Sequence, residues 1–288
     1  MTIYDTRNNL AKVRAATVLA DDGKQLAATR FEPAGPARGA VVLAPAMATP
    51  SRFYAPFATW LAESGFHVLT FDYRGTESIA AMKAETGDAL RWAGDAASAL
   101  ESLVDEDLGL PLTWIGHSMG GQFLPFARHD LLDRALIVAA GSGYWRWNSD
   151  GVRRRAPLLF RVIAPVAMRV AGYYPGGRLG ILGDAPSAAM RQWSKWCMSP
   201  DYYGVDVPDL ADRVAELEVP ISSLSFSDDE LLGPQSIRAL EELFGPTVEP
   251  HRLSPQDLDV ARIGHHGFFR EAMLPTWETT VLPHLAAE

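Results

Sequence analysis

The pattern of apolar and polar positions near the start of the chain predicts a pair of strands. Apolar and polar residues alternate over residues 12–20 and again over residues 26–31. An alternation with a period of two is typical of strands that bury one face. The two segments are separated by Asp21, Asp22 and Gly23, residue types that favour a tight turn. We therefore expect the sheet to begin with an antiparallel hairpin.

Further along the chain, short continuous apolar runs replace this alternation. Such runs are typical of strands buried on both faces of a parallel sheet. They cover residues 40–43, 66–71, 112–115, 135–139 and 221–226, and residues 250–253 are a further candidate for the last strand. Apolar residues at helical spacing occupy residues 54–63, 88–104, 120–128, 237–243 and 271–285. The succession of strands and helices predicts an α/β fold with a mostly parallel sheet.

Residues 144–203 interrupt this succession. They contain no strand-like run bounded by turns, but they hold four of the eight Trp and five of the eight Tyr residues. A length of 288 residues is compatible with one large domain or two average ones. We interpret residues 1–143 and 204–288 as one core domain and residues 144–203 as an insertion into it.

Composition and charge indicate which kinds of molecule the protein can bind. With 48% hydrophobic and 21% charged residues, the chain can bury a sizeable core. Its 26 basic and 35 acidic residues give a net charge of −9, which argues against a nucleic acid partner. The charge is uneven, because the insertion has nine basic and three acidic residues (+6) and the remainder therefore carries −15. This split predicts salt-sensitive docking of the insertion or a preference for anionic substrates.

The sequence also indicates where the protein works. Cys197 is the single cysteine, which rules out an internal disulfide framework and a cysteine-based zinc cage. The first ten residues lack the basic start and apolar core of a secretory signal. Residues 156–174 are interrupted by Arg161, Pro165 and Arg169, so they fall short of a membrane span. We expect a cytoplasmic protein without a transmembrane segment.

The motif with the clearest chemistry follows the predicted strand 112–115. It reads Gly116-His117-Ser118-Met119-Gly120 and leads into a predicted helix, which is the strand-turn-helix setting of a G-x-S-x-G nucleophile elbow. A nucleophile on so tight a turn has a strained backbone, and bulky neighbours two residues away would collide with the strand and helix. The sequence therefore predicts that Ser118 is a nucleophile.

A serine nucleophile needs a base and a group that orients the base. His265 and His266 lie in a glycine-bounded loop after the last predicted strand, and we choose His265 as the base with His266 as the fallback. Asp228 and Asp229 follow the buried strand 221–226, and the length of that strand favours Asp229 as the acid. The order serine, acid, histidine along the chain fits this architecture.

The oxyanion of an acyl-transfer reaction needs two backbone N–H donors. Met119, directly after the nucleophile, is expected to supply one of them. The register of the strand over residues 40–43 points to Met47 as the other. There is no phosphate-binding loop, no dinucleotide fingerprint and no zinc-binding H-E-x-x-H helix, so we expect neither a cofactor nor a metal. The sequence Asp72-Tyr73-Arg74-Gly75 is interpreted as a structural turn.

These motifs together give the chain a family resemblance. It resembles the α/β-hydrolase superfamily and, within it, the bacterial serine aminopeptidase-like branch of predicted hydrolases. The residues that carry the resemblance lie at 45–47, 71–75, 116–122, 140–145, 225–229 and 263–270. The resemblance implies an eight-stranded, mostly parallel sheet flanked by helices, with residues 144–203 as a helical cap after the sixth strand. It also favours His265 over His266, whereas Pro45-Ala46 departs from the superfamily's usual histidine-glycine oxyanion loop.

The resulting hypothesis is covalent acyl transfer by a Ser118, His265 and Asp229 triad, with carboxylic ester hydrolysis of a small molecule as the default reaction. An amidase or aminopeptidase and an acyltransferase are alternatives on the same triad, and a non-catalytic binding protein is an alternative of another class. Tyr144 and Trp145 are candidate substrate-binding residues, although the aromatic residues of the insertion could equally seal it against the sheet. The sequence leaves the oligomeric state open.

Overall fold

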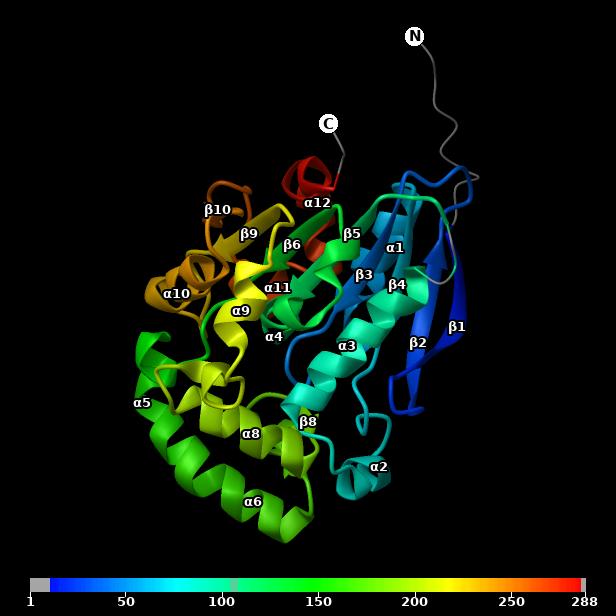
Figure 1. Cartoon of the computed structure of the whole chain (residues 1–288). Helices are drawn as coiled ribbons and strands as arrows, with labels where there is room; N and C mark the ends of the chain where they lie inside the picture. Colours follow the sequence, from blue (N-terminus) through cyan, green and yellow to red (C-terminus); the bar gives the residue numbers. More distant parts are fainter. Residues whose placement is uncertain (1–10, 105, 107, 286–288) are drawn as a thin grey trace.

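One large twisted sheet organises the structure. The computed structural model describes residues 11–104, 106 and 108–285. Eight strands form the sheet in the order β1-β2-β4-β3-β5-β6-β9-β10, and β2 alone runs in the opposite direction to the other seven (Figure 1). The strands are β1 (Lys12–Leu19), β2 (Gln25–Glu32), β3 (Gly39–Ala44), β4 (Phe66–Phe71), β5 (Leu112–His117), β6 (Arg134–Val138), β9 (Ile221–Phe226) and β10 (Val248–Leu253). The predicted eight-stranded, mostly parallel sheet is confirmed.

Helices cover the sheet on both faces and fill the connections. They are α1 (Ala55–Glu63), α2 (Ile79–Ala84), α3 (Ala89–Val104), α4 (Met119–Gln122), α5 (Asp150–Leu158), α6 (Ala164–Ala171), α7 (Gly176–Leu179), α8 (Ser187–Cys197), α9 (Leu210–Ala215), α10 (Pro234–Phe244), α11 (Gly264–Gly267) and α12 (Leu274–Thr280). Successive β3 residues point to opposite faces, so Val42 joins the core under α3 while Val41 joins the core under α1 and α12. The alternation buries every β3 side chain.

The strands that are buried on both faces begin and end close to where the sequence predicts. The strands β4 and β9 match the predicted residues 66–71 and 221–226, and the hairpin of β1 and β2 turns at Gly23, whose φ is +82°. Residues 120–128 were expected to form one helix, and this prediction is wrong. The helix α4 ends at Gln122 and a 3-10 turn covers Leu124–Phe126, because Pro125 has no N–H to continue the helical ladder.

The predicted closing helix over residues 271–285 is also wrong as a single element. It is divided into a 3-10 turn (Glu271–Met273), the helix α12 and a second 3-10 turn (Leu282–His284). Pro275 and Pro283 each occupy the first turn of a new segment, where a missing N–H costs nothing. The short helix α2 was not predicted from the sequence, although Ser78 caps it by accepting a hydrogen bond from the Ala81 N–H at 3.1 Å.

The segment between β6 and β9 is mainly helical. Its longest element is a continuous helix of α5, a π-helical turn (Leu159–Ile163) and α6, which lies at the outer edge of the molecule (Figure 1). No strand was expected here, but β7 (Tyr174–Pro175) and β8 (Asp184–Ala185) form a separate two-stranded ladder. The boundaries of the insertion at residues 144 and 203 stay a prediction.

The expected absence of a secretory signal concerns the first ten residues, which lie outside the described residues. Within the part of the chain that the structure describes, no helix has the length and apolarity needed to cross a membrane.

Candidate active site

Ser118 occupies the sharp turn between β5 and α4 at the carboxyl end of the sheet. Its backbone has φ +51° and ψ −113°, a conformation that costs energy for a residue with a side chain. The Ser118 N–H donates to the Val138 carbonyl oxygen at 2.9 Å, which ties the turn to the end of β6. A Cβ atom at Gly120 would overlap the Ala44 carbonyl oxygen, and one at Gly116 would overlap the backbone of Gly121. The two glycines of the motif are therefore required by close backbone packing.

His265 and Asp229 form a buried pair. Their side chains are 3% and 0% exposed, and His265 Nδ1 lies 2.8 Å from Asp229 Oδ2. The second carboxylate oxygen, Oδ1, accepts from the N–H groups of Leu231 and Leu232 at 2.7 and 2.9 Å. Burial by itself would raise the pKa of Asp229, but the hydrogen bond from His265 and those from the two N–H groups hold it below its usual value. Asp229 is therefore ionised at neutral pH and orients the imidazole.

The other ring nitrogen of His265, Nε2, makes no hydrogen bond to any described residue. It is the atom that remains to accept a proton. Ser118 Oγ and His265 are not joined by a hydrogen bond here; the link between their loops is His117, the residue before Ser118. The ring centroids of His117 and His265 are 5.2 Å apart.

The two carboxylates beside Asp229 hold the histidine loop by its backbone. Asp228 accepts from the N–H groups of Ile263 and Gly264 at 2.8 and 3.1 Å. Glu230 accepts from the His265 N–H at 3.1 Å. The three consecutive carboxylates, Asp228, Asp229 and Glu230, therefore all contact the histidine loop, but Asp229 alone among them bonds to an imidazole ring.

His266, the fallback base, has a different environment. Its Nε2 lies 3.4 Å from the Thr49 hydroxyl, in the loop after β3. Burial and the neighbouring His265 lower the pKa of His266 to about 4. It is therefore neutral at pH 7 and contacts a hydroxyl where His265 contacts a carboxylate. This environment favours His265 as the base.

A buried hydrogen-bond chain connects the three loops of the site, and the sequence did not predict it. The Ala46 N–H donates to the Tyr54 hydroxyl at 2.9 Å, the hydroxyl lies 2.8 Å from His117 Nδ1, and His117 Nε2 lies 3.0 Å from the His265 carbonyl oxygen. Burial and the nearby imidazoles of His265 and His266 keep the pKa of His117 well below its usual value, so its ring is neutral.

The tautomer of His117 follows from its partners. A carbonyl oxygen only accepts, so His117 Nε2 must carry the proton and Nδ1 must accept from the Tyr54 hydroxyl. Each of these polar groups is fully buried and has a partner. Tyr54 lies 63 residues before His117, so only the topology of the sheet brings the two together.

Replacing Tyr54 with phenylalanine is expected to lower both stability and activity. The change removes two hydrogen bonds and leaves a buried N–H and a buried imidazole nitrogen unpaired, at a cost of about 1–3 kcal/mol of unfolding free energy. Because this chain of hydrogen bonds also positions the Ala46 loop and His265, we expect kcat to fall about tenfold. Urea denaturation and kcat with a soluble ester measure the two effects.

Tyr203→Phe is the matched control for that substitution. The Tyr203 hydroxyl is also buried but has no hydrogen-bond partner. Removing it should leave stability unchanged or slightly higher. If Tyr203→Phe lowered stability and kcat as much as Tyr54→Phe, the loss of a buried hydroxyl would by itself explain the effect at Tyr54. The hydrogen-bond chain would then have no special role.

The two predicted oxyanion donors lie in the expected loops. Met47 follows β3 and Met119 is the first residue of α4, and both side chains are buried. The Ala46 N–H is already paired with Tyr54 and Pro45 has no N–H, so Met47 carries the first unpaired N–H after β3. Neither the Met47 nor the Met119 N–H donates to an acceptor within the described residues.

The insertion contacts the elbow and the Met47 loop. The Tyr202 hydroxyl donates to Gln122 Oε1 at 2.9 Å, and Trp193 Nε1 donates to the same hydroxyl at 3.0 Å. Gly183 lies against Ala48 so closely that any side chain would overlap the Ala48 carbonyl oxygen. The insertion therefore lies beside two of the loops in which we predict catalytic groups.

Charge plays a small part in this docking. Of the nine basic residues in the insertion, Lys195 pairs with Asp206 and Arg153 with Asp150, and the others form no ion pair with described residues. The expected salt-sensitive docking is therefore supported by one ion pair only. The predicted substrate-binding residues Tyr144 and Trp145 lie six and seven residues after the last residue of β6, with ring centroids 6.4 Å apart.

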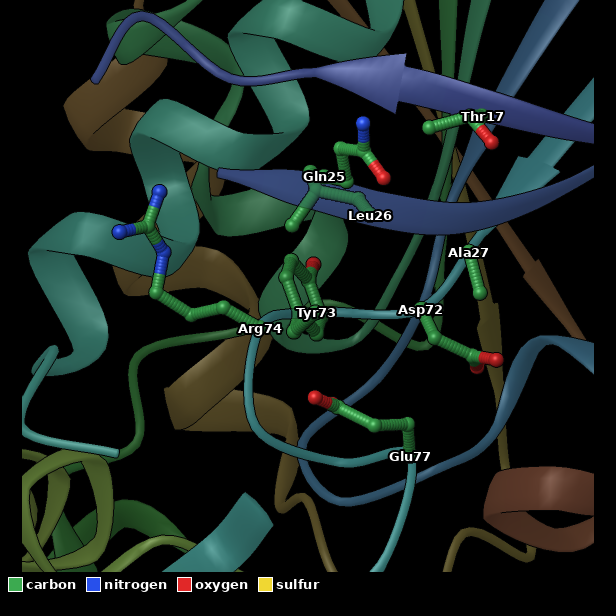
Figure 2. Close-up of a pocket in the computed structure, with 8 residues that line it drawn as sticks. All are labelled: Thr17, Gln25, Leu26, Ala27, Asp72, Tyr73, Arg74 and Glu77. Carbon is green, nitrogen blue, oxygen red and sulfur yellow. The ribbon is translucent and has the colours of Figure 1, made fainter. Parts of the chain in front are cut away.

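The segment Asp72-Tyr73-Arg74-Gly75 is a structural turn, as predicted. Arg74 is buried and pairs with Asp95 and with Asp22, both at 2.6 Å. The hydrogen bond from Arg74 to Asp22 holds the pKa of Asp22 well below its usual value. A cavity of about 260 Å³ lies beside the turn, and in Figure 2 the Arg74 guanidinium points away from Asp72 and Glu77. None of the residues predicted for catalysis lines this cavity.

Among the described residues, no group of three or more His, Cys, Asp and Glu could hold a metal.

A comparison with models of protein families identifies the family of this chain. Residues 35–179, which are 145 of the 288, match the model of the family described as serine aminopeptidase, S33. The chain belongs to the serine aminopeptidase S33 family. The matched part of this S33 family chain includes the elbow with Ser118 and ends before Asp229 and His265. The resemblance seen in the sequence is thereby confirmed. A search of curated proteins gives no match.

Solved structures of similar fold include several ester-cleaving proteins. A soluble variant of a monoglyceride lipase from Saccharomyces cerevisiae, in complex with a substrate analogue, aligns with a TM-score of 0.65 at 14% identity over 99% of both chains. A cold-adapted esterase from an Arctic intertidal metagenomic library gives 0.57 at 15% identity over 99% of both chains. A thermostable carboxyl esterase from Bacillus coagulans gives 0.60 at 13% identity, over 95% of this chain and 99% of that one. These similarities show that the S33 family chain has the α/β-hydrolase fold.

Proposed function

We propose that this α/β-hydrolase is a serine hydrolase that cleaves carboxylic esters of small molecules through an acyl-enzyme. The observation that carries the proposal is the buried bond of 2.8 Å between His265 and Asp229, on a loop that His117 ties to the elbow holding Ser118. An ionised carboxylate against one imidazole nitrogen leaves the other nitrogen basic, which is the arrangement that activates a serine.

The reaction then has two halves. His265 Nε2 takes the Ser118 hydroxyl proton as Oγ attacks the ester carbonyl, and the N–H groups of Met47 and Met119 stabilise the oxyanion. Collapse of this intermediate breaks the ester bond, and the leaving alcohol takes the proton from His265. Water then attacks the acyl-enzyme and gives a proton to His265. When this second intermediate collapses, His265 returns the proton to Ser118 Oγ and the carboxylic acid is released.

The insertion at residues 144–203 is proposed to be the cap that selects the substrate. Its hydrogen bond to Gln122 through Tyr202 and its close contact at Ala48 support a position over the nucleophile. Tyr144 and Trp145 are proposed to contact an apolar group of the substrate. We propose the cytoplasm as the compartment, where the lone buried thiol of Cys197 would stay reduced.

A panel of substrates tests the class of reaction. We expect kcat/KM for p-nitrophenyl esters, graded by acyl length, to exceed that for amino-acid anilides by about 10³-fold or more, because an alkoxide or phenoxide leaves far more readily than an amine. The family description names an aminopeptidase, which makes the anilides the informative comparison. Equal or faster turnover of the anilides would replace the esterase by an aminopeptidase on the same residues.

A further inference from the structure

An exposed apolar row runs along the outer helix of the insertion. Leu158, Val162, Val166 and Val170 are 57%, 50%, 58% and 83% exposed, and each is four residues after the one before. Val170 is the most exposed of the large hydrophobic residues in the described chain. The buried side chains of the same helix, Ala156, Phe160, Ala164 and Met168, repeat at the same spacing and face the core. The helix is thus apolar on two sides, and only one of these sides packs against the core of the described structure.

The π-helical turn keeps this row straight. In a regular α-helix, residues four apart drift by about 40° around the axis at each step. At Leu159–Ile163 the bonding changes, and the Ala164 N–H donates to the Leu159 carbonyl oxygen five residues earlier. The wider turn reverses part of the drift. The continuous helix from Asp150 to Ala171 is about 33 Å long and presents its apolar row along one side.

Basic side chains accompany the row. Arg154, Arg155, Arg161 and Arg169 are exposed, and none forms an ion pair with a described residue. The helix also contains Arg153, whose charge is balanced by Asp150 at 2.7 Å. The face therefore combines four exposed aliphatic residues with four unpaired positive charges. In Figure 1 the green helix of α5 and α6 lies at the edge of the molecule, away from the sheet.

We propose that this face, formed by Leu158, Val162, Val166, Val170 and the four unpaired arginines, binds the surface of an anionic lipid bilayer. A helix with an aliphatic row beside arginines lies in the plane of a bilayer, with the row among the upper acyl carbons and the guanidinium groups at the phosphates. The helix is too polar on this side to cross the membrane, so the binding is peripheral.

Charge complementarity favours this partner over a second copy of the chain. A two-fold dimer through the face would place the arginines of one helix against those of the other, with no acidic residue other than Asp150 on either helix to neutralise them. An anionic lipid surface supplies phosphates along the whole length of the helix. The proposal goes beyond the hydrolase reaction and rests on none of its catalytic residues.

Binding to vesicles tests the proposal without reference to activity. The full-length protein should sediment with phosphatidylcholine vesicles that contain about one third phosphatidylglycerol at about 0.15 M salt, and only weakly with pure phosphatidylcholine. Raising the salt to about 1 M should release most of it. In V166D/V170D the partition coefficient should fall about tenfold or more, because two exposed valines no longer enter the apolar layer. R161E/R169E should lose the preference for anionic vesicles.

Leu274→Asp is the matched control, since Leu274 is 46% exposed at the first residue of α12, on another part of the surface. It should bind vesicles like the wild type, and circular dichroism should show all variants folded. Absence of binding to either vesicle, equal binding to both, or an equal loss in Leu274→Asp would overturn the proposal. So would a dimer, seen by analytical ultracentrifugation, that V166D/V170D dissociates, because the face would then belong to a second copy.

Discussion

Replacing His265 with alanine is expected to lower kcat for a soluble ester by about 10⁵-fold. It should also cost about 3 kcal/mol of unfolding free energy, because the buried Asp229 carboxylate loses its partner. The imidazole is the group that takes the Ser118 proton in the proposed mechanism, and its Nε2 has no other partner among the described residues. Without it, a serine hydroxyl stays protonated and is a poor nucleophile. Steady-state kinetics of the purified variant, with a melting curve beside them, measure this effect.

His266→Ala is the control that separates the two adjacent histidines. His266 contacts the Thr49 hydroxyl and no carboxylate, and its low pKa keeps it neutral. Its loss should reduce kcat by no more than about tenfold, since only the packing of the neighbouring loops changes. A collapse of activity in His266→Ala, with His265→Ala near the wild type, would exchange the roles of the two residues.

The second large effect is expected at Asp229. Substitution by asparagine keeps the size of the side chain but removes the charge that stabilises the imidazolium, and it offers an N–H₂ group where His265 Nδ1–H needs an acceptor. We expect kcat to fall about 10⁴-fold. Kinetics at saturating ester, together with the KM, show that the loss lies in turnover and not in binding.

Asp228→Asn provides the comparison within the same acidic cluster. It leaves one of the N–H groups of Ile263 and Gly264 without its carboxylate partner, so we expect about 1 kcal/mol less stability in urea and a small change in kcat. A larger loss of turnover in Asp228→Asn than in Asp229→Asn would contradict the assignment of the acid.

The sequence predicts those parts of the fold in which burial is the dominant force. The strands β4 and β9 are buried on both faces and their apolar runs mark the ends directly. The helix after Ser118 was overestimated because apolar residues at helical spacing continue past Gln122, whereas Pro125 removes the N–H that the ladder needs. Local patterns cannot weigh such a break against packing.

The candidate site shows the same division. The positions of Ser118, Asp229 and His265 could be proposed from a motif, a strand end and the order of the three residues, all of which can be read along the sequence. The hydrogen-bond chain from Ala46 through Tyr54 and His117 could not be proposed in this way. It joins residues of separate elements that only the order of the strands in the sheet brings together. Similarly, the apolar stretch after residue 156 gave no sign of which of its residues would be buried by the core.

The nucleophile is the central claim, and covalent labelling tests it most directly. A fluorophosphonate probe reacts only with a serine whose hydroxyl is activated and whose oxyanion is stabilised. Intact mass measurement of the native protein should show one adduct per chain, and peptide mapping should place it on Ser118. The Ser118→Ala variant should remain unlabelled under the same conditions. Equal labelling of wild type and Ser118→Ala, or no labelling of a folded wild type, would contradict the account.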